Sequence, residues 1–135
     1  MRIVMDTNVL VSGLLTPFGV CGTILGALTS NSFTLLVDSR ILFEYEDVLR
    51  RPHFKFSHKT IDVVIKYIEN ASEIHNALPL RESLPDSDDN QFLEIAISAG
   101  ADCLVTGNLK HFPLNLRCGV NVLSPREFLA ILKKN

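Results

Sequence analysis

Residues 85–108 predict a helix that leads directly into a buried strand. The helix begins among three aspartates, Asp86, Asp88 and Asp89. It ends at Gly100, a residue that suits the left-handed position just past a helix end. The strand that follows, residues 103–106, is short and apolar up to its last residue, which is typical of a strand covered on both faces. A chain in which helices alternate with such strands is expected to be an α/β protein.

Asp89 stands at the start of the apolar stripe of this helix. The stripe has the i+3, i+4 and i+7 spacing of one helical face, with Phe92, Leu93 and Ala96. A carboxylate that faces the core costs free energy unless something pairs with it, so its presence there indicates a site. The alternative is capping, because acids in a first turn satisfy free N–H groups and the helix dipole. Taken alone, the helix favours capping, whereas the rest of the chain favours a site.

The remaining elements extend the same alternation along the chain. Strands are predicted at residues 2–5, 33–37, 103–106 and 120–123, and helices at 9–15, 24–28, 41–51, 61–68, 89–99 and from 124 onward. Residues 73–80 fit either an extended segment or the tail of a helix. This order implies a parallel sheet covered by helices on both faces. At 135 residues the chain is expected to form one domain, residues 1–135.

Composition excludes several classes of protein. Hydrophobic residues make up 47% and charged residues 21%, as in soluble globular proteins. No apolar run approaches the ~20 residues of a membrane span, and no signal peptide is evident, so we expect a cytoplasmic protein. The three cysteines match no zinc spacing and are expected to be reduced thiols. A net charge of −2 argues against broad coating of nucleic acid but permits a local basic patch.

Polar residues follow the predicted strands at the point where each strand ends. Asp6 and Asn108 each follow a strand, and ligands of parallel sheets lie at the carboxyl ends of strands. An acid near residue 44 and the helix-start Asp89 could converge on the same rim. Oxygen ligands without cysteine or histidine favour Mg²⁺ or Mn²⁺. With a phosphate substrate, such a site suits metal-assisted hydrolysis.

Five motifs spread between residues 3 and 112 carry a more specific resemblance. They are Ile3 to Val9, Ser39 with Glu44 five residues later, Val48 to Pro52, Asp88 to Asn90 with Ala96, and Leu104 to Asn108. In this order and separation they resemble the PIN-domain ribonucleases that serve as toxins in VapC-like toxin–antitoxin pairs. The resemblance implies a three-layer α/β/α sandwich with a central parallel sheet. It also implies RNA cleavage that depends on Mg²⁺ or Mn²⁺, without a covalent intermediate.

The resemblance also assigns roles to single residues. Asp6, Glu44 and Asp89 match the catalytic, metal-binding acids of the family. Asn108 replaces the usual fourth acid, so it would be a metal ligand that brings no charge. The implied partners are an RNA substrate and a small antitoxin protein, and a homodimer is compatible with the resemblance. Periodicity alone does not choose between Glu44 and Glu46, because both flank the apolar face of their helix. The spacing from Ser39 favours Glu44.

Other polar residues near these motifs are candidates for orienting or binding roles. Orienting roles are assigned to Thr7, Asn8, Ser39 and Thr106, with helix capping as the alternative for Asn8 and Ser39. Asp86 could reach the metal through water, although a turn residue is the simpler interpretation. Cations at Arg50, Arg51, Lys55 and Lys110 could contact RNA phosphates. A solvated helix end, or an exposed turn around Lys110 and His111, explains the same residues without RNA.

Two other functions fit parts of the sequence. A haloacid-dehalogenase-type phosphatase also places an aspartate after its first strand, but its second aspartate is replaced by Asn8 here. A degenerate PIN domain that binds RNA or a protein partner without cleavage is favoured by the uncharged Asn108. Trapping of an aspartyl-phosphate would identify the phosphatase, and a ribonuclease assay with Mn²⁺ would separate an active from a degenerate PIN domain.

Overall fold

A five-stranded parallel sheet forms the centre of the protein. The computed structural model describes residues 1–134, so the last residue of the predicted domain, residue 135, lies outside them. The sheet has the strand order β3-β2-β1-β4-β5. Its strands are β1 (Arg2–Met5), β2 (Thr34–Val37), β3 (Glu73–Ile74), β4 (Cys103–Val105) and β5 (Val122–Leu123). All neighbouring strands pair in parallel.

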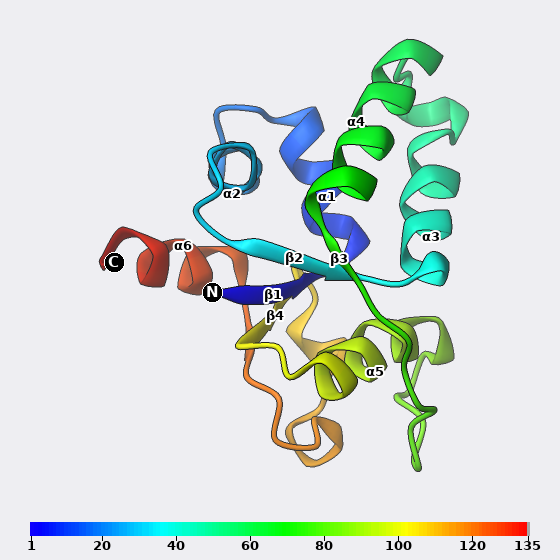
Figure 1. Ribbon diagram of the computed structural model, residues 1–135, viewed down its shortest axis with the longest axis vertical. Helices are drawn as coiled ribbons and strands as arrows, with labels where there is room; N and C mark the ends of the chain where they lie inside the picture. The colour runs from blue at the N-terminus through cyan, green and yellow to red at the C-terminus, as the bar shows by residue number, and fades with distance from the viewer. Residues whose placement is uncertain (135) are drawn as a thin grey trace.

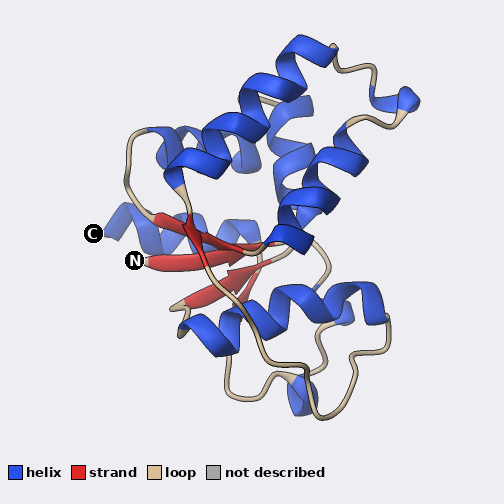
Figure 2. Ribbon diagram, turned by 45° about the vertical axis from the view of Figure 1, so that its right-hand side comes forward, coloured by secondary structure: helices blue, strands red, loops and turns tan. Residues whose placement is uncertain are grey.

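Six α-helices connect and cover the strands. They are α1 (Thr7–Leu15), α2 (Val20–Thr29), α3 (Ser39–Leu49), α4 (His58–Ala71), α5 (Asn90–Ala99) and α6 (Pro125–Lys134). Figure 1 shows α1 to α4 on one side of the sheet and α5 on the other, and α6 packs against α2 and β5. In Figure 2 the sheet lies between the two helical layers. The predicted α/β/α sandwich with a central parallel sheet is confirmed.

The strands are buried because their apolar side chains point to both faces. Ile3, Val4 and Met5 of β1 have no exposed surface, and the same holds for Leu104 and Val105 of β4. A central parallel strand covered by helices on both sides needs such a continuous apolar run, since neither face meets water. The sequence therefore positions the centre of the sheet, and with it the residues that follow each strand.

The strand order reverses between β1 and β4. The chain leaves β1 through α1 and α2 on one face of the sheet, whereas it enters β4 from α5 on the other face (Figure 1). Met5 of β1 pairs with Val105 of β4, so Asp6 and Thr106 lie opposite each other just past the carboxyl ends of these strands. Ligands of open α/β sheets bind at such a reversal point. This edge of the sheet is therefore where a site is expected.

The predicted elements match the observed ones apart from their ends. Residues 73–80, left open by the sequence, contain the short edge strand β3 and then irregular chain. Gly100 has a φ of +66°, the left-handed conformation predicted for it. At the start of α6, the Ser124 amide donates to Glu127 Oε1 and the Glu127 amide donates to Ser124 Oγ, as a capping box requires.

Two further features bear on the predictions. Four single-turn 3₁₀ helices within residues 1–134 were not predicted. They are η1 (Pro52–Phe54), η2 (Ser87–Asp89), η3 (Leu109–His111) and η4 (Leu114–Leu116). Within residues 1–134 no single helix has the length and apolar character to cross a membrane, although α1 and α2 would pass that test as a pair bent by 100°.

Candidate functional site

Asp6 occupies the first position after β1, at the N-terminal end of α1. Its side chain is 5% exposed, and its carboxylate accepts hydrogen bonds from Thr106 Oγ1 at 2.7 Å and from Asn8 Nδ2 at 3.2 Å. Asn8 also uses its Oδ1 to accept from the Gly107 amide at 3.0 Å. The end of β1 is thus tied to the end of β4 through the side chains that hold Asp6. Burial raises the pKa of Asp6, and the Thr106 hydrogen bond opposes this effect.

Glu44 reaches the same edge from α3. Its carboxylate accepts from the Thr7 hydroxyl and, through its other oxygen, from Gln91 Nε2 at 2.9 Å. These two contacts join α3 to the start of α1 and to α5. Burial raises the pKa of Glu44, and the negative charges of Asp6 and Asp88 raise it further.

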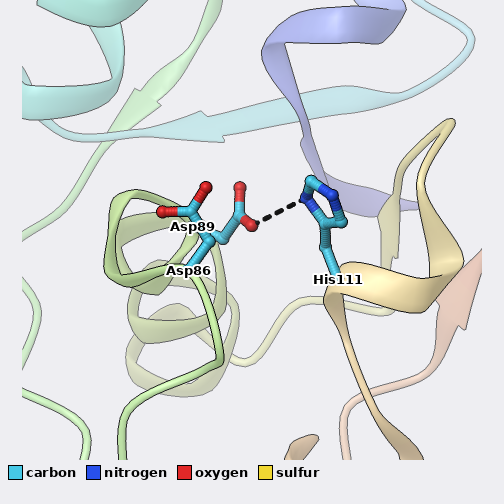
Figure 3. Close-up of side chains that lie close together, drawn as sticks. All are labelled: Asp86, Asp89 and His111. Atoms are coloured by element: carbon cyan, nitrogen blue, oxygen red, sulfur yellow. Dashed lines mark hydrogen bonds and ion pairs between the residues drawn. The ribbon is translucent and has the colours of Figure 1, made fainter.

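Asp89 lies at the start of α5, but it does not cap the helix. Its backbone occupies the cap position without a side-chain capping bond, and the Asp86 carboxylate instead accepts from the Asp88 amide at 3.0 Å. The Asp89 carboxylate contacts His111, with 3.0 Å between Oδ2 and Nδ1 (Figure 3). The capping alternative for Asp89 is therefore wrong, and its carboxylate is directed toward the residues after β4.

The three acids form one electrostatic cluster. Burial is the largest cause of the raised pKa of Asp89, and the charge of Asp6 adds to it, so that this pKa is about 6. The His111 side chain lowers the pKa of both Asp6 and Asp89 and so opposes the effect in each. Because the charge of Asp6 raises the pKa of both Glu44 and Asp89, these carboxylates lie close enough to Asp6 to be repelled by it, and a cation that binds among them would relieve that repulsion.

The closest set of ligand atoms differs from the set predicted by sequence. Within residues 1–134 only one group of three or more His, Cys, Asp or Glu residues has ligand atoms within 4.8 Å of one another, and it consists of Asp86, Asp89 and His111. Asp6, just past β1, and Glu44, on α3, lie outside this group, and each is held by its own hydrogen bonds. The charge of Asp6 acts on both Glu44 and Asp89, but within residues 1–134 the three predicted acids do not form one group at ligand distance.

Asn108 lies on the exposed side of the same edge. Its backbone amide donates to Thr106 Oγ1 at 3.0 Å, and its side chain makes no hydrogen bond to any residue between 1 and 134. Thr106 consequently holds both Asp6 and the start of the loop that carries Asn108. Sequence reasoning missed the contact between His111 and Asp89, because it considered His111 only together with Lys110, as an RNA contact or as part of an exposed turn.

Ser39 is exposed and opens α3 without capping it. The capping alternative for Ser39 is wrong, because Asp38 Oδ1 accepts from the Ile41 amide at 2.9 Å. Ser39 instead lines a cleft of about 710 Å³ between α3 and α5, together with Glu44, Arg51, Asp88 and Gln91.

The basic residues proposed for RNA binding do not form one patch. Arg50 is engaged in ion pairs with Glu46 and Asp62, which tie α3 to α4 and favour a structural role for it. Arg51 lines the cleft beside Glu44. The exposed Lys55 follows η1, and the exposed Lys110 precedes His111 in η3. Arg51 and Lys110 therefore each adjoin one residue of the candidate site, Glu44 across the cleft and His111 along the chain.

Comparison with known proteins places this geometry in a family. The PIN-domain model matches residues 2–110. The chain is similar in fold to a chain of VapBC2 from Rickettsia felis, in a crystal structure of VapBC2 bound to a DNA fragment from its promoter. The TM-score is 0.62 and the sequence identity 17%, and the match covers 92% of this chain and 98% of that one. The chain is also similar to PAE2754 from Pyrobaculum aerophilum, with a TM-score of 0.59 and 13% identity over 99% of this chain and 90% of that one. No protein with a curated description matches the sequence. The matched model covers most of the chain and all the acids of the site, so the chain belongs to the PIN-domain family.

Proposed function

We propose that this PIN domain is an endoribonuclease whose activity depends on Mg²⁺ or Mn²⁺. The observation that carries the proposal is the cluster of Asp6, Glu44 and Asp89 at the strand-order reversal, where burial raises the pKa of each acid and the charge of Asp6 raises the pKa of Glu44 and Asp89 further. The alternative function, a haloacid-dehalogenase-type phosphatase, does not fit a chain that matches the PIN-domain family over residues 2–110.

The donor atoms of the cluster fit a hard divalent cation. Carboxylate oxygens are the ligands that Mg²⁺ and Mn²⁺ prefer, and partly buried carboxylates that repel one another favour binding a cation. Asp6, Glu44 and Asp89 would hold the ion, with the Asn108 amide oxygen as the fourth ligand suggested by the sequence. When bound, the ion supplies Lewis-acid chemistry, polarising a phosphate oxygen and lowering the pKa of a water molecule.

The chain's own residues supply position and charge. Thr106 and Asn8 fix the Asp6 carboxylate, while Thr7 and Gln91 fix that of Glu44. Because these partners lie at the start of α1, directly after β4 and in α5, the acids are held on rigid elements. Such preorganisation reduces the rearrangement needed when a phosphate group enters. Arg51, which lines the cleft with Glu44, and Lys110, which precedes His111 in η3, would contact RNA phosphates.

A role as the toxin of a toxin–antitoxin pair is the biological part of the proposal. It is supported by membership of the PIN-domain family and by the fold similarity to VapBC2 of Rickettsia felis. In this role the partner is a small antitoxin protein, the substrate is cytoplasmic RNA, and the domain can assemble as a homodimer. Purification of the chain with the product of a neighbouring small reading frame would test the partnership.

An RNA-binding PIN domain without activity is the second candidate, because the Asn108 side chain is uncharged and exposed. A cleavage assay separates the two. The purified protein should cut single-stranded RNA with Mg²⁺ or Mn²⁺ and lose this activity in chelator. Asp6→Asn and Asp89→Asn should abolish cleavage and retain the fold, whereas Glu69→Gln, an exposed acid on α4, should cut normally. Equal activity in chelator, or in both site variants, would refute the proposal.

A further inference from the structure

His111 is the one nitrogen donor among the clustered acids. Its ring lies with the carboxylates of Asp86 and Asp89 in the group whose ligand atoms are all within 4.8 Å (Figure 3). Asp86 caps η2, Asp89 ends it, and His111 ends η3, so two separate loops meet here. The sequence suggested an all-oxygen site, but the structure adds an imidazole to it.

The position of His111 is set by the fold. Its backbone amide donates to the Asn108 carbonyl at 3.0 Å, and the next residue, Phe112, is wholly buried. The buried Phe112 anchors η3 beside α5, which leaves the His111 side chain 45% exposed and the Asp89 side chain 12% exposed. One side of the pair is therefore open to an ion from solvent, while the other side is fixed to the core.

We infer that His111 is a metal ligand of this site and gives it a preference for Mn²⁺ over Mg²⁺. The inference rests on the proposed metal-dependent function, and it names one ligand of the ion and the ion that the site prefers. An ion held by Asp89 and the neutral His111 ring also lies near Asp6, because a positive charge at position 111 lowers the pKa of Asp6. The nitrogen donor thus belongs to the same cluster as the acids.

The preference follows from the chemistry of the donor. Mg²⁺ takes oxygen ligands in near-ideal octahedral geometry and loses water reluctantly. Carboxylate oxygens suit both Mg²⁺ and Mn²⁺, whereas imidazole suits transition-metal ions, of which Mn²⁺ is one and Mg²⁺ is not. Asn108 offers a neutral amide oxygen on an exposed side chain that contacts no other polar group in residues 1–134. His111, not Asn108, is therefore the fourth ligand that the structure favours.

Binding of each ion alone, measured by isothermal titration calorimetry, tests the inference. The wild type should bind Mn²⁺ more tightly than Mg²⁺. His111→Ala and His111→Gln should weaken Mn²⁺ binding by about tenfold or more. Removing a residue that merely hydrogen-bonds to a metal ligand already lowers metal affinity by about 10- to 100-fold. Both variants should leave Mg²⁺ binding nearly unchanged. His53→Gln, which removes an exposed histidine of η1 outside the site, is the matched control and should retain the Mn²⁺ preference.

A spectroscopic measurement identifies the ligand without relying on activity. Pulsed electron paramagnetic resonance of Mn²⁺ bound to the wild type should show coupling to a nitrogen nucleus. The coupling should change when the histidines are isotopically labelled, and it should vanish in His111→Gln.

Three outcomes separate the inference from the proposed function. If Mn²⁺ binds without nitrogen coupling, or His111 variants lose both ions equally, His111 only positions Asp89 and the inference fails while metal dependence stands. Loss of the Mn²⁺ preference in Asn108→Ala but not in His111→Gln would assign the ligand to Asn108. If the wild type binds neither ion, the proposed metal-dependent function fails with it.

Discussion

Replacing Asp89 by asparagine should stabilise the metal-free protein at neutral pH. Burial and the charge of Asp6 raise the pKa of Asp89, so its ionised form is less stable in the folded protein than in the unfolded chain. Asparagine has nearly the same shape, can still accept a hydrogen bond from His111, and carries no charge. The variant therefore removes the ionisation cost and keeps the packing at the start of α5.

The size of the effect follows from the pKa. The folded-state pKa of about 6 compares with an ordinary value of 3.8, and one pKa unit corresponds to about 1.4 kcal/mol. Ionisation of Asp89 therefore costs at most about 3 kcal/mol of folding free energy. Because the adjoining His111 side chain is 45% exposed, water screens part of this cost, and we expect a gain of about 1 to 2 kcal/mol.

The effect should depend on pH with a defined sign. Below pH 3.8 Asp89 is protonated in both folded and unfolded states, so the stability difference between the two proteins should be constant. Between pH 3.8 and about 6 the unfolded state releases the proton first, and the wild type should lose stability relative to the variant. Above about pH 6 the difference should reach its plateau.

Urea unfolding with chelator at a series of pH values measures this difference. Glu69→Gln removes one exposed acid far from the site and controls for the change in net charge. Parallel stability curves for wild type and Asp89→Asn from pH ~4 to ~8, or a variant that is less stable than the wild type at pH ~8, would refute the reasoning.

Two predictions concern the framework of the site. Tyr45→Phe should lower the free energy of unfolding by about 1 to 2 kcal/mol, because the buried Tyr45 hydroxyl donates to the carbonyl of Met5, next to Asp6. Gly100→Ala should cost about 1 kcal/mol because its φ is +66°, whereas Gly26→Ala, in α2 with open space around the added methyl group, should stabilise by about 0.5 to 1 kcal/mol. Urea unfolding checks all three, and a loss at position 26 would contradict the backbone argument.

The parts of the fold that could be predicted are those set by local pattern. Apolar runs without alternation mark β1 and β4 as buried parallel strands, and the residues after them then lie at the carboxyl edge. Gly100 marks the end of α5 for a purely local reason, its tolerance of positive φ. The PIN-domain family and the α/β/α layers were predicted from the order and separation of five motifs between residues 3 and 112. The first and the last of these motifs overlap β1 and β4.

Contacts between loops could not be predicted, because no local period encodes them. Asp89 and His111 are 22 residues apart, and they meet only because η2 and η3 are anchored on the same edge of the sheet. Single-turn 3₁₀ helices have little sequence signature, so the orientation of His111 was not foreseen. Likewise, Asp38 and Ser39 can both cap a helix, and only the backbone shows that Asp38 does so.

The pairing of β1 with β4 determines when the site can form during synthesis of the chain. β1 is synthesised first, yet Asp6 takes its hydrogen bond from Thr106, 100 residues later in the chain. Pairing between such distant segments is slow and cannot precede synthesis of β4. A ribosome-bound chain that stops before residue 103 contains Asp6, Glu44 and Asp89 but lacks Thr106 and His111. With the proposed ribonuclease activity, this order of assembly would keep the nascent chain harmless to the messenger RNA that is still being translated.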